Sequence, residues 1–475
     1  MLNLRNKKDE IDPHYLFMAT FSLALFSSGF PVEEVLHRLG SQQYFSPYDG
    51  YYKRISNLVS GYGFKISAAV TNTLNLVGVT PFKQFLIRFS QAISYGDNLV
   101  EFLSRELETE STIFRAVNER KQEGMNTFLA LYGTLNSALV FLIVDITILS
   151  VLYNLGANFV VLLSVAVSMV SALMTLVVYV LYKPYAKMIF PRHGYAMSVA
   201  ALASSAILIM VFRTPQLIFV SGVGLLCLGI YFKLNERSID RIERDYLVFV
   251  RYFTRTFDVV GTLKHSLLSV LRGELGTMRD IVKKMQVRSD LGVDKVKIFR
   301  IMGEETKSHM VLMGNAVLAS TLEAGGNIGY VGEKLSSLME MLLNIRGRRE
   351  QNGKTFETTV YILQGTSAAV GGALISIVDS FVKLFSSLAT YSIFNVSSAN
   401  IPEVEFLVLM ILVLLSYANG FAISIAYGKP MATSVFYIGL LLALTLVSYE
   451  AALLLTNSIF SSITLSGQLT QPPAQ

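Results

Sequence analysis

The sequence has few of the side chains from which disulfide frameworks and metal centres are built. One cysteine, Cys227, stands among 475 residues, so no intrachain disulfide can form. Five scattered histidines include no HExxH pair, and we therefore expect no metal site. Charge is scarce as well, because Asp, Glu, Lys and Arg make up 16% of the chain while soluble domains carry about 25%. With 52% hydrophobic residues, the composition is typical of a membrane protein.

Charged residues gather in two blocks. Residues 1–126 carry 26 charged side chains and residues 233–354 carry 36, whereas 127–232 carry 5 and 355–475 carry 7. The first block balances 13 basic against 13 acidic side chains, so the second, with 21 against 15, holds the whole net charge of +6. The predicted domains are a cytoplasmic helical lobe over 1–126, four membrane spans over 127–232, a second, basic lobe over 233–354, three spans over 355–456 and an extracytoplasmic tail over 457–475.

Seven segments have the roughly 20 apolar residues that a helix needs to cross a bilayer. Basic residues in short loops favour the cytoplasmic side, and Lys183, Lys187, Arg192 and Lys429 therefore place both lobes and the amino terminus inside the cell. The carboxyl terminus and the 379–403 connection then lie outside, where Asn395 begins a sequon that need not be used. The predicted spans are 127–152, 157–182, 195–212, 215–232, 356–378, 404–427 and 431–455.

Residues 15–30 form an apolar stretch that could pass for a signal peptide or an eighth span. It is only 16 residues long, follows a leader of both charges, and ends at Glu33 and Glu34. Its counterpart over 246–261 contains three charged side chains. We therefore expect a helix in the core of the first lobe.

The two lobes are copies of one unit, related by a constant offset in the sequence. Gly96-Asp97-Asn98-Leu99 aligns with Gly325-Gly326-Asn327-Ile328, and Arg120 to Gly124 aligns with Arg349 to Gly353. We call the step from Gly96 to Gly325 the repeat offset. Apolar residues recur at steps of four and three from Val331 to Ile345, which predicts a helix, and the first copy repeats most of them. We expect each lobe to be a bundle of about six helices with the glycine tetrads as tight turns. Equal orientation of both lobes requires an even number of crossings between them, and four are predicted.

No catalytic or cofactor-binding residues are expected. Residues 347–355 end like a phosphate-binding loop, but five residues separate the glycines where the motif has four, and no strand precedes it. No nucleophile elbow or paired-carboxylate site appears either. Asp145 lies inside the first span, where an acid can mark a proton or ion route, although we favour a position near the external interface or a polar helix contact.

The tandem of helical units, each with a Gly-x-x-Leu-like turn and each running into membrane helices, resembles the type II secretion F-domain family. The order of lobe, four spans, lobe and three spans is most similar to the archaeal platform proteins of type IV pili and the archaellum (the FlaJ/ArlJ group). The first copy has the fuller motif, which continues from Leu99 to Glu101, while the second has Tyr330 in place of that glutamate.

This resemblance implies an all-α integral membrane protein with two repeated cytoplasmic helical bundles and about seven membrane helices. It also implies a platform without enzymatic activity. Such a platform anchors a hexameric cytoplasmic ATPase and passes its motion to pilin or archaellin subunits, as a homodimer in the bilayer. Adhesive pilus and archaellum stay equally open.

Two other classes of function are less consistent with the residues. A transporter or channel needs embedded charges along a path, and only Asp145 is well placed. A nucleic-acid scaffold would use the basic lobe, but 15 acidic residues interrupt it without aromatic interleaving, so we expect no nucleic-acid partner.

Three groups of residues are candidates for specific roles. Lys283, Lys284 and Arg288, in an expected mid-lobe connection, and Arg346, Arg348 and Arg349 beside the membrane are candidate ATPase contacts, the latter three equally suited to lipid headgroups. Gly124 and Gly353 are candidate hinges between each lobe and its membrane helix, or simply helix joints. Gly365, Ala369 and Ala373 would allow close helix packing, either within the chain or across a dimer.

Overall fold

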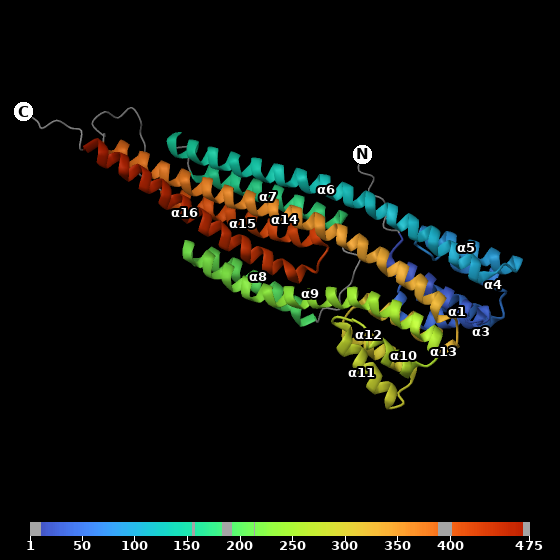
Figure 1. The fold of residues 1–475 in the computed structure, drawn as a ribbon. Helices are drawn as coiled ribbons and strands as arrows, with labels where there is room; N and C mark the ends of the chain where they lie inside the picture. Colours follow the sequence, from blue (N-terminus) through green and yellow to red (C-terminus); the bar gives the residue numbers. More distant parts are fainter. Residues whose placement is uncertain (1–10, 154–156, 183–191, 213, 388–400, 469–475) are drawn as a thin grey trace, which may run out of the picture. The chain divides into compact units, whose positions relative to one another are not determined.

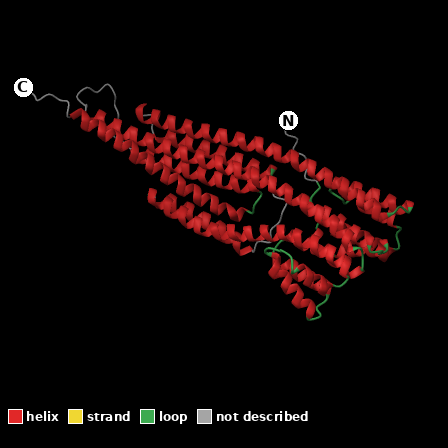
Figure 2. Cartoon of the chain, viewed as in Figure 1, coloured by secondary structure: helices red, strands yellow, loops and turns green. Residues whose placement is uncertain are grey.

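A computed structural model describes residues 11–153, 157–182, 192–212, 214–387 and 401–468. Every regular element in these ranges is a helix, as Figure 2 shows, so the predicted all-α class is confirmed for them. The described residues divide into two compact units. The first holds residues 11–120 and 236–347, and the second holds 121–153, 157–182, 192–212, 214–235, 348–387 and 401–468.

The first unit is built around a single apolar core. Buried side chains from residues 11–114 and from 246–339 belong to the same cluster, so the helices of both predicted lobes share one interior. The helices of this unit (Figure 1) are α1 (Pro13–Ser27), α2 (Val32–Ser41), η2 (Gln43–Phe45), α3 (Tyr48–Tyr62), α4 (Ile66–Leu74), α5 (Thr80–Tyr95), α10 (Leu263–Val270), α11 (Met278–Asp290), α12 (Lys295–Thr306) and α13 (His309–Ala324), together with parts of α6 (Leu99–Tyr153), α9 (Pro215–Val260) and α14 (Ile328–Ser387).

Helix α1 crosses the middle of this core. All its residues from His14 to Phe26 are buried, and it packs against α13 of the second repeat. Asp12 caps its first turn by accepting a hydrogen bond from the Tyr15 amide at 2.9 Å, and Pro13 occupies the first helical position, where its missing N–H costs nothing. The prediction of a core helix at residues 15–30 is confirmed.

Tight turns join α5 to α6 and α13 to α14. Gly96 and Gly325 end the preceding helices in the left-handed conformation, with φ of 72° and 67°, which glycine adopts without strain. The Asn98 and Asn327 side chains then cap the next helix, accepting backbone N–H groups at 3.1 and 2.9 Å. The first and last residues of α13 lie one repeat offset after the first and last residues of α5, so the predicted glycine turns are confirmed in both places.

The second unit consists of long apolar helices. Three helices, α6 (Leu99–Tyr153), α9 (Pro215–Val260) and α14 (Ile328–Ser387), contribute residues to both units. The remaining helices are α7 (Ala157–Leu181), α8 (Arg192–Phe212), α15 (Ile401–Tyr427), η3 (Met431–Thr433) and α16 (Ser434–Gln468).

Within the described residues, five helical segments are long and apolar enough to cross a membrane, and they coincide with five of the seven predicted spans. The other two predictions fall on α6 and α7, partly on residues whose side chains lie outside the described part of the chain. The candidate spans are Gly194–Val211, Pro215–Val260, Ile328–Val382, Val404–Tyr427 and Met431–Phe460.

Glycines let α16 approach its neighbours closely. A Cβ atom on Gly229 of α9 would lie 2.3 Å from the Phe436 Cα, and one on Gly372 of α14 would lie 2.3 Å from the Tyr449 carbonyl oxygen. Contacts of this kind are how helices pack in lipid, where no hydrophobic force drives them together.

Candidate functional site

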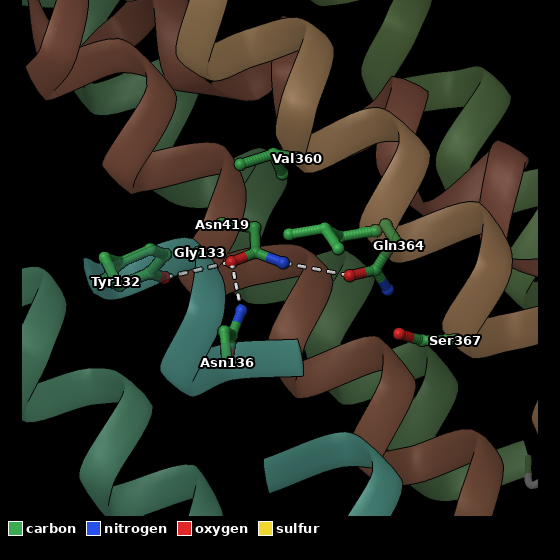
Figure 3. A pocket seen from close by; sticks show the side chains of 8 residues that line it. Tyr132, Gly133, Asn136, Val360, Gln364, Ser367 and Asn419 are labelled. Atoms are coloured by element: carbon green, nitrogen blue, oxygen red, sulfur yellow. Dashed lines mark hydrogen bonds between the residues drawn. The ribbon is translucent and has the colours of Figure 1, made fainter. Parts of the chain in front are cut away.

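Amide and hydroxyl side chains of the second unit converge on Asn419 of α15, as Figure 3 shows. Its Oδ1 accepts hydrogen bonds from the Tyr132 hydroxyl at 3.0 Å and from the Asn136 amide at 2.6 Å, both on α6. Its Nδ2 donates to Gln364 Oε1 of α14 at 2.9 Å. One carboxamide therefore ties three long helices together.

Gln364 extends the network to a fourth helix. Its Nε2 lies 3.0 Å from the Ser416 hydroxyl of α15 and 2.9 Å from the Thr445 hydroxyl of α16. Gln364, Asn419 and both hydroxyls are buried. A buried network of this kind fixes the register of the helices, because sliding one of them would strand polar groups in an apolar interior.

The network is suited to holding helices rather than to binding a ligand. The cavity beside it, lined by Asn136, Gln364 and Asn419, measures about 10 Å³, whereas pockets for organic ligands measure about 300–1,000 Å³. Asn136 Oδ1 is buried and makes no hydrogen bond to protein. None of the side chains in the network carries a formal charge, whereas ionisable side chains are the usual mark of an ion route through a membrane.

The sequence analysis missed this network, although the signal was available. Gln364 and Asn419 each stand inside an apolar span, where a polar side chain is costly unless it finds a partner. Asp145, which we had singled out instead, lies in α6 with a side chain outside the described part, and Asn395 is likewise outside it.

A second site lies where α14 enters the second unit. The Arg349 guanidinium donates hydrogen bonds to the carbonyl oxygens of Tyr182 at 2.5 Å, Ile425 at 2.8 Å and Ala426 at 3.2 Å. These carbonyls end α7 and α15, where the helix dipole is negative and no intrahelical donor remains. Arg349 therefore caps two helices at once.

Tyr427, the last residue of α15, lies across α14 beside Arg349. Its ring covers Gly353, so that a Cβ atom there would lie 2.9–3.1 Å from three ring carbons. Its hydroxyl donates to Glu357, which also accepts from the Tyr361 hydroxyl at 2.7 Å. We call Arg349, Gly353, Glu357 and Tyr427 the Tyr427 clamp. Its three α14 members recur every four residues and share one helix face.

The two candidate hinge glycines therefore have different surroundings. Helices α6 and α14 both continue without interruption through Gly124 and Gly353. A Cβ on Gly124 would make only an ordinary contact, 3.5 Å from the Tyr182 hydroxyl. Gly353 has a packing role that its sequence position did not predict, while the hinge hypothesis for both glycines stays a prediction.

The structure separates the six basic candidates. Arg346 pairs with the buried Glu243 and lies 3.5 Å from Asp240, and Arg288 pairs with Glu305. With Arg349 in the clamp, three of the six already have a structural role. Arg348 is exposed and has an interaction of its own.

The remaining two, Lys283 and Lys284, are exposed. We had placed them in a connection, but they lie inside α11, because buried Val282 and Met285 alternate with the lysines at helical spacing.

The other predicted residues have local roles. A Cβ on Gly365 would lie 3.6 Å from Ser448 of α16, which is packing within the chain. Ala369 and Ala373, one and two turns further along α14, are half-buried. Gly326 leaves room for Ser28, which a Cβ there would overlap, and Asp97 donates its backbone amide to Ala92. Leu99 begins α6 and Glu101 pairs with Arg105 on its surface.

The first unit contains a buried charge cluster that the sequence analysis also missed. Arg88 of α5 pairs with Glu106 and lies 3.3 Å from Glu110, both on α6 and both buried. Burial, followed by the charge of Glu106, raises the pKa of Glu110 to about 7. The equivalent positions of the second repeat are apolar and buried, so the cluster belongs to the first repeat alone; they are Val317, Leu335 and Met339.

Comparison with known proteins gives matches to one family. Residues 19–147 match the family described as Type II secretion system (T2SS), protein F. Flagella accessory protein J of Methanocaldococcus jannaschii is 22% identical over 418 residues, which cover 81% of this chain and 74% of the relative. The protein of the same name from Methanococcus voltae is 22% identical over 363 residues, covering 71% and 64%. No solved structure matches significantly. The resemblance to the type II secretion F family drawn from the sequence is thus confirmed, with its domain at residues 19–147.

Proposed function

We propose that this protein is the membrane platform of an archaeal type IV filament assembly machine. On this proposal it anchors a hexameric cytoplasmic ATPase and couples its motion to the insertion of pilin or archaellin subunits, without catalysing a reaction itself. The observation that carries the proposal is the similarity to Flagella accessory protein J over 81% of the chain, together with the type II secretion F domain.

The path of the chain supports a coupling role. Helices α6, α9 and α14 each belong to both compact units, so the unit rich in charge and the unit of apolar helices are joined by continuous helix three times. A continuous helix transmits displacement better than a loop, because its backbone hydrogen bonds resist local bending. Motion imposed on the first unit therefore has three stiff routes into the second.

The helix bounds support a duplicated domain. The starts of α4, α5 and α6 recur, at the repeat offset, as the starts of α12, α13 and α14. We propose two type II secretion F-like repeats, seven membrane spans, both repeats in the cytoplasm and the carboxyl terminus outside. This topology places four membrane spans between the repeats, and an even number is what two repeats on the same side of the membrane require. A homodimer in the bilayer completes the proposal.

The contact with the ATPase is proposed on the basic repeat. Lys283 and Lys284 are exposed on α11, while Arg288, Arg346 and Arg349 are engaged within the chain. Of the six candidates, the two lysines are thus the best suited to meet an acidic partner. Charge reversal of both should weaken ATPase binding more at low salt than at high salt, because salt screens exposed charges.

Affinity purification of the tagged protein from its own membranes tests the function. Mass spectrometry of the co-purified proteins should identify a secretion ATPase and a pilin or archaellin. Deletion of the gene should abolish one type of surface filament, and the wild-type gene should restore it. A deletion strain that keeps every filament, with no ATPase among the co-purified proteins, would contradict the proposal.

A further inference from the structure

Helices α3 and α11, at equivalent positions of the two repeats, carry the same outward pattern. Each has a basic residue followed by two apolar residues at steps of four, so the first two share one helix face; the third is the last residue of α3 and the C-cap residue directly after α11. The α3 stripe comprises Arg54, Leu58 and Tyr62, and the α11 stripe comprises Lys283, Val287 and Leu291, each residue following its counterpart by the repeat offset.

The apolar ends of both stripes lie in solvent. Tyr62 and Leu291 are each 76% exposed, and Val287 is 52% exposed, while Leu58 is half-buried. Gly63 and Gly292 follow them in the left-handed conformation, with φ of 68° and 73°, Gly63 as the C-cap of α3 and Gly292 directly after Leu291, the C-cap of α11. A single exposed apolar side chain needs no explanation, but its recurrence at the same place in both repeats does.

Exposed positive charge accompanies each stripe. Lys53 and Arg54 on α3, and Lys283 and Lys284 on α11, are exposed and form no ion pair within the described part of the chain. An acidic partner would neutralise this charge and cover the apolar residues. Each of the two helices presents two exposed basic residues beside its stripe, whereas protein segments that bind anionic lipid carry about four to eight, so a protein partner fits better than a bilayer surface.

We propose that the α3 and α11 stripes are two equivalent docking surfaces for acidic, amphipathic helices on two identical subunits of a cytoplasmic ATPase. One chain with two equivalent surfaces can bind two identical partner subunits, and a hexameric ATPase offers identical subunits. The inference rests on the proposed function and adds the docking surface, the chemistry of the partner and the number of subunits bound.

Binding of the purified ATPase to the full-length protein in detergent tests this. The variants are Tyr62→Ser, Leu291→Ser and their combination, with Val259→Ser as a matched control, because Val259 is 87% exposed and lies outside both stripes. Each single variant should bind one ATPase subunit per chain where the wild type binds two. The double variant should lose affinity by more than about tenfold, as the loss of a central apolar contact does. The control should bind as the wild type does.

Other outcomes overturn the inference in distinguishable ways. Equal ATPase binding by the wild type and the double variant would leave the proposed function intact but show that the stripes are not its docking surfaces. If the wild type binds no ATPase, the proposed function itself fails. A double variant that loses only self-association, measured by light scattering, or only binding to vesicles with anionic phospholipid, would assign the stripes to a second copy or to the membrane.

Discussion

Replacement of Gly353 by alanine should destabilise the protein, whereas the same change at Gly124 should stabilise it. Alanine inside a helix gains about 1 kcal/mol over glycine at either position. At Gly124 the new methyl group would lie 3.5 Å from the Tyr182 hydroxyl, an ordinary contact, so the gain is kept. At Gly353 it would lie 2.9 Å from the Tyr427 Cγ, which is closer than two carbon atoms can approach without displacement.

The Tyr427 ring cannot move aside easily, because both of its ends are held. Its hydroxyl is bound by Glu357, and Arg349 binds the two carbonyls that precede its backbone. Overpacking of this kind costs about 1–3 kcal/mol, and with the propensity gain of about 1 kcal/mol subtracted the net loss should be up to about 2 kcal/mol.

Thermal unfolding of the two purified variants in one detergent measures the difference. Gly124→Ala should unfold above the wild type and Gly353→Ala below it. In a Tyr427→Ala background, Gly353→Ala should lose its penalty, because the overlapping ring is gone. Equal shifts for both glycines, or a penalty that persists without the ring, would refute the reasoning.

Three further predictions follow from the other sites. The folded protein keeps a proton on Glu110 up to about pH 7, whereas the unfolded chain releases it near the ordinary pKa of 4.5, so the wild type should lose thermal stability between about pH 5 and pH 7. Glu110→Gln should reduce this loss. A wild type whose stability rises in this window would contradict the prediction. Arg349→Ala should lower the unfolding free energy by about 2–3 kcal/mol in chemical denaturation, because the carbonyls that Arg349 caps lose their donor. Exposed Arg348→Ala should change it by less than about 1 kcal/mol, and equal losses for both variants would show that Arg349 does not act as a cap. Asn419→Leu should cost about 3 kcal/mol in the same assay, because it leaves the buried Gln364 Oε1 without its amide donor, and a neutral result would show that the network relaxes.

Local patterns in the sequence predicted much of the first unit. The apolar stripe from Val331 to Leu338 is buried, and the glycine turns at Gly96 and Gly325 have the left-handed backbone that their residue type favours. These features depend on residues a few positions apart, so a single sequence contains them. The same holds for the membrane helices, since hydropathy is a property of one segment.

Contacts between distant segments were not predictable in this way. Tyr427 covers Gly353, which lies on another helix, and Asn419 of α15 joins Gln364 of α14 to Tyr132, far upstream on α6. The local sequence around these residues does not indicate which residue each of them contacts, because these contacts depend on how whole helices pack together. The shared core of the two repeats escaped notice for the same reason, since charge blocks separated in sequence need not be separate domains.

The repeats differ at the junctions where α6 and α14 pass from the first unit into the second. Helix α14 carries the Tyr427 clamp, but the equivalent positions of α6 hold Phe128 in place of Glu357 and an exposed Arg120 in place of Arg349. A displacement of α14 must therefore carry the ends of α7 and α15 with it, whereas a Cβ on Gly124 of α6 would make only an ordinary contact with the Tyr182 hydroxyl. If a hinge exists, the structure favours α6 as its place and α14 as the rigid lever. Gly124→Ala, which fits without strain, tests whether α6 is the hinge. A variant that is more stable, binds ATPase normally and yet assembles fewer filaments would locate the hinge at Gly124. Unchanged filament assembly would show that α6 is as stiff a connection as α14.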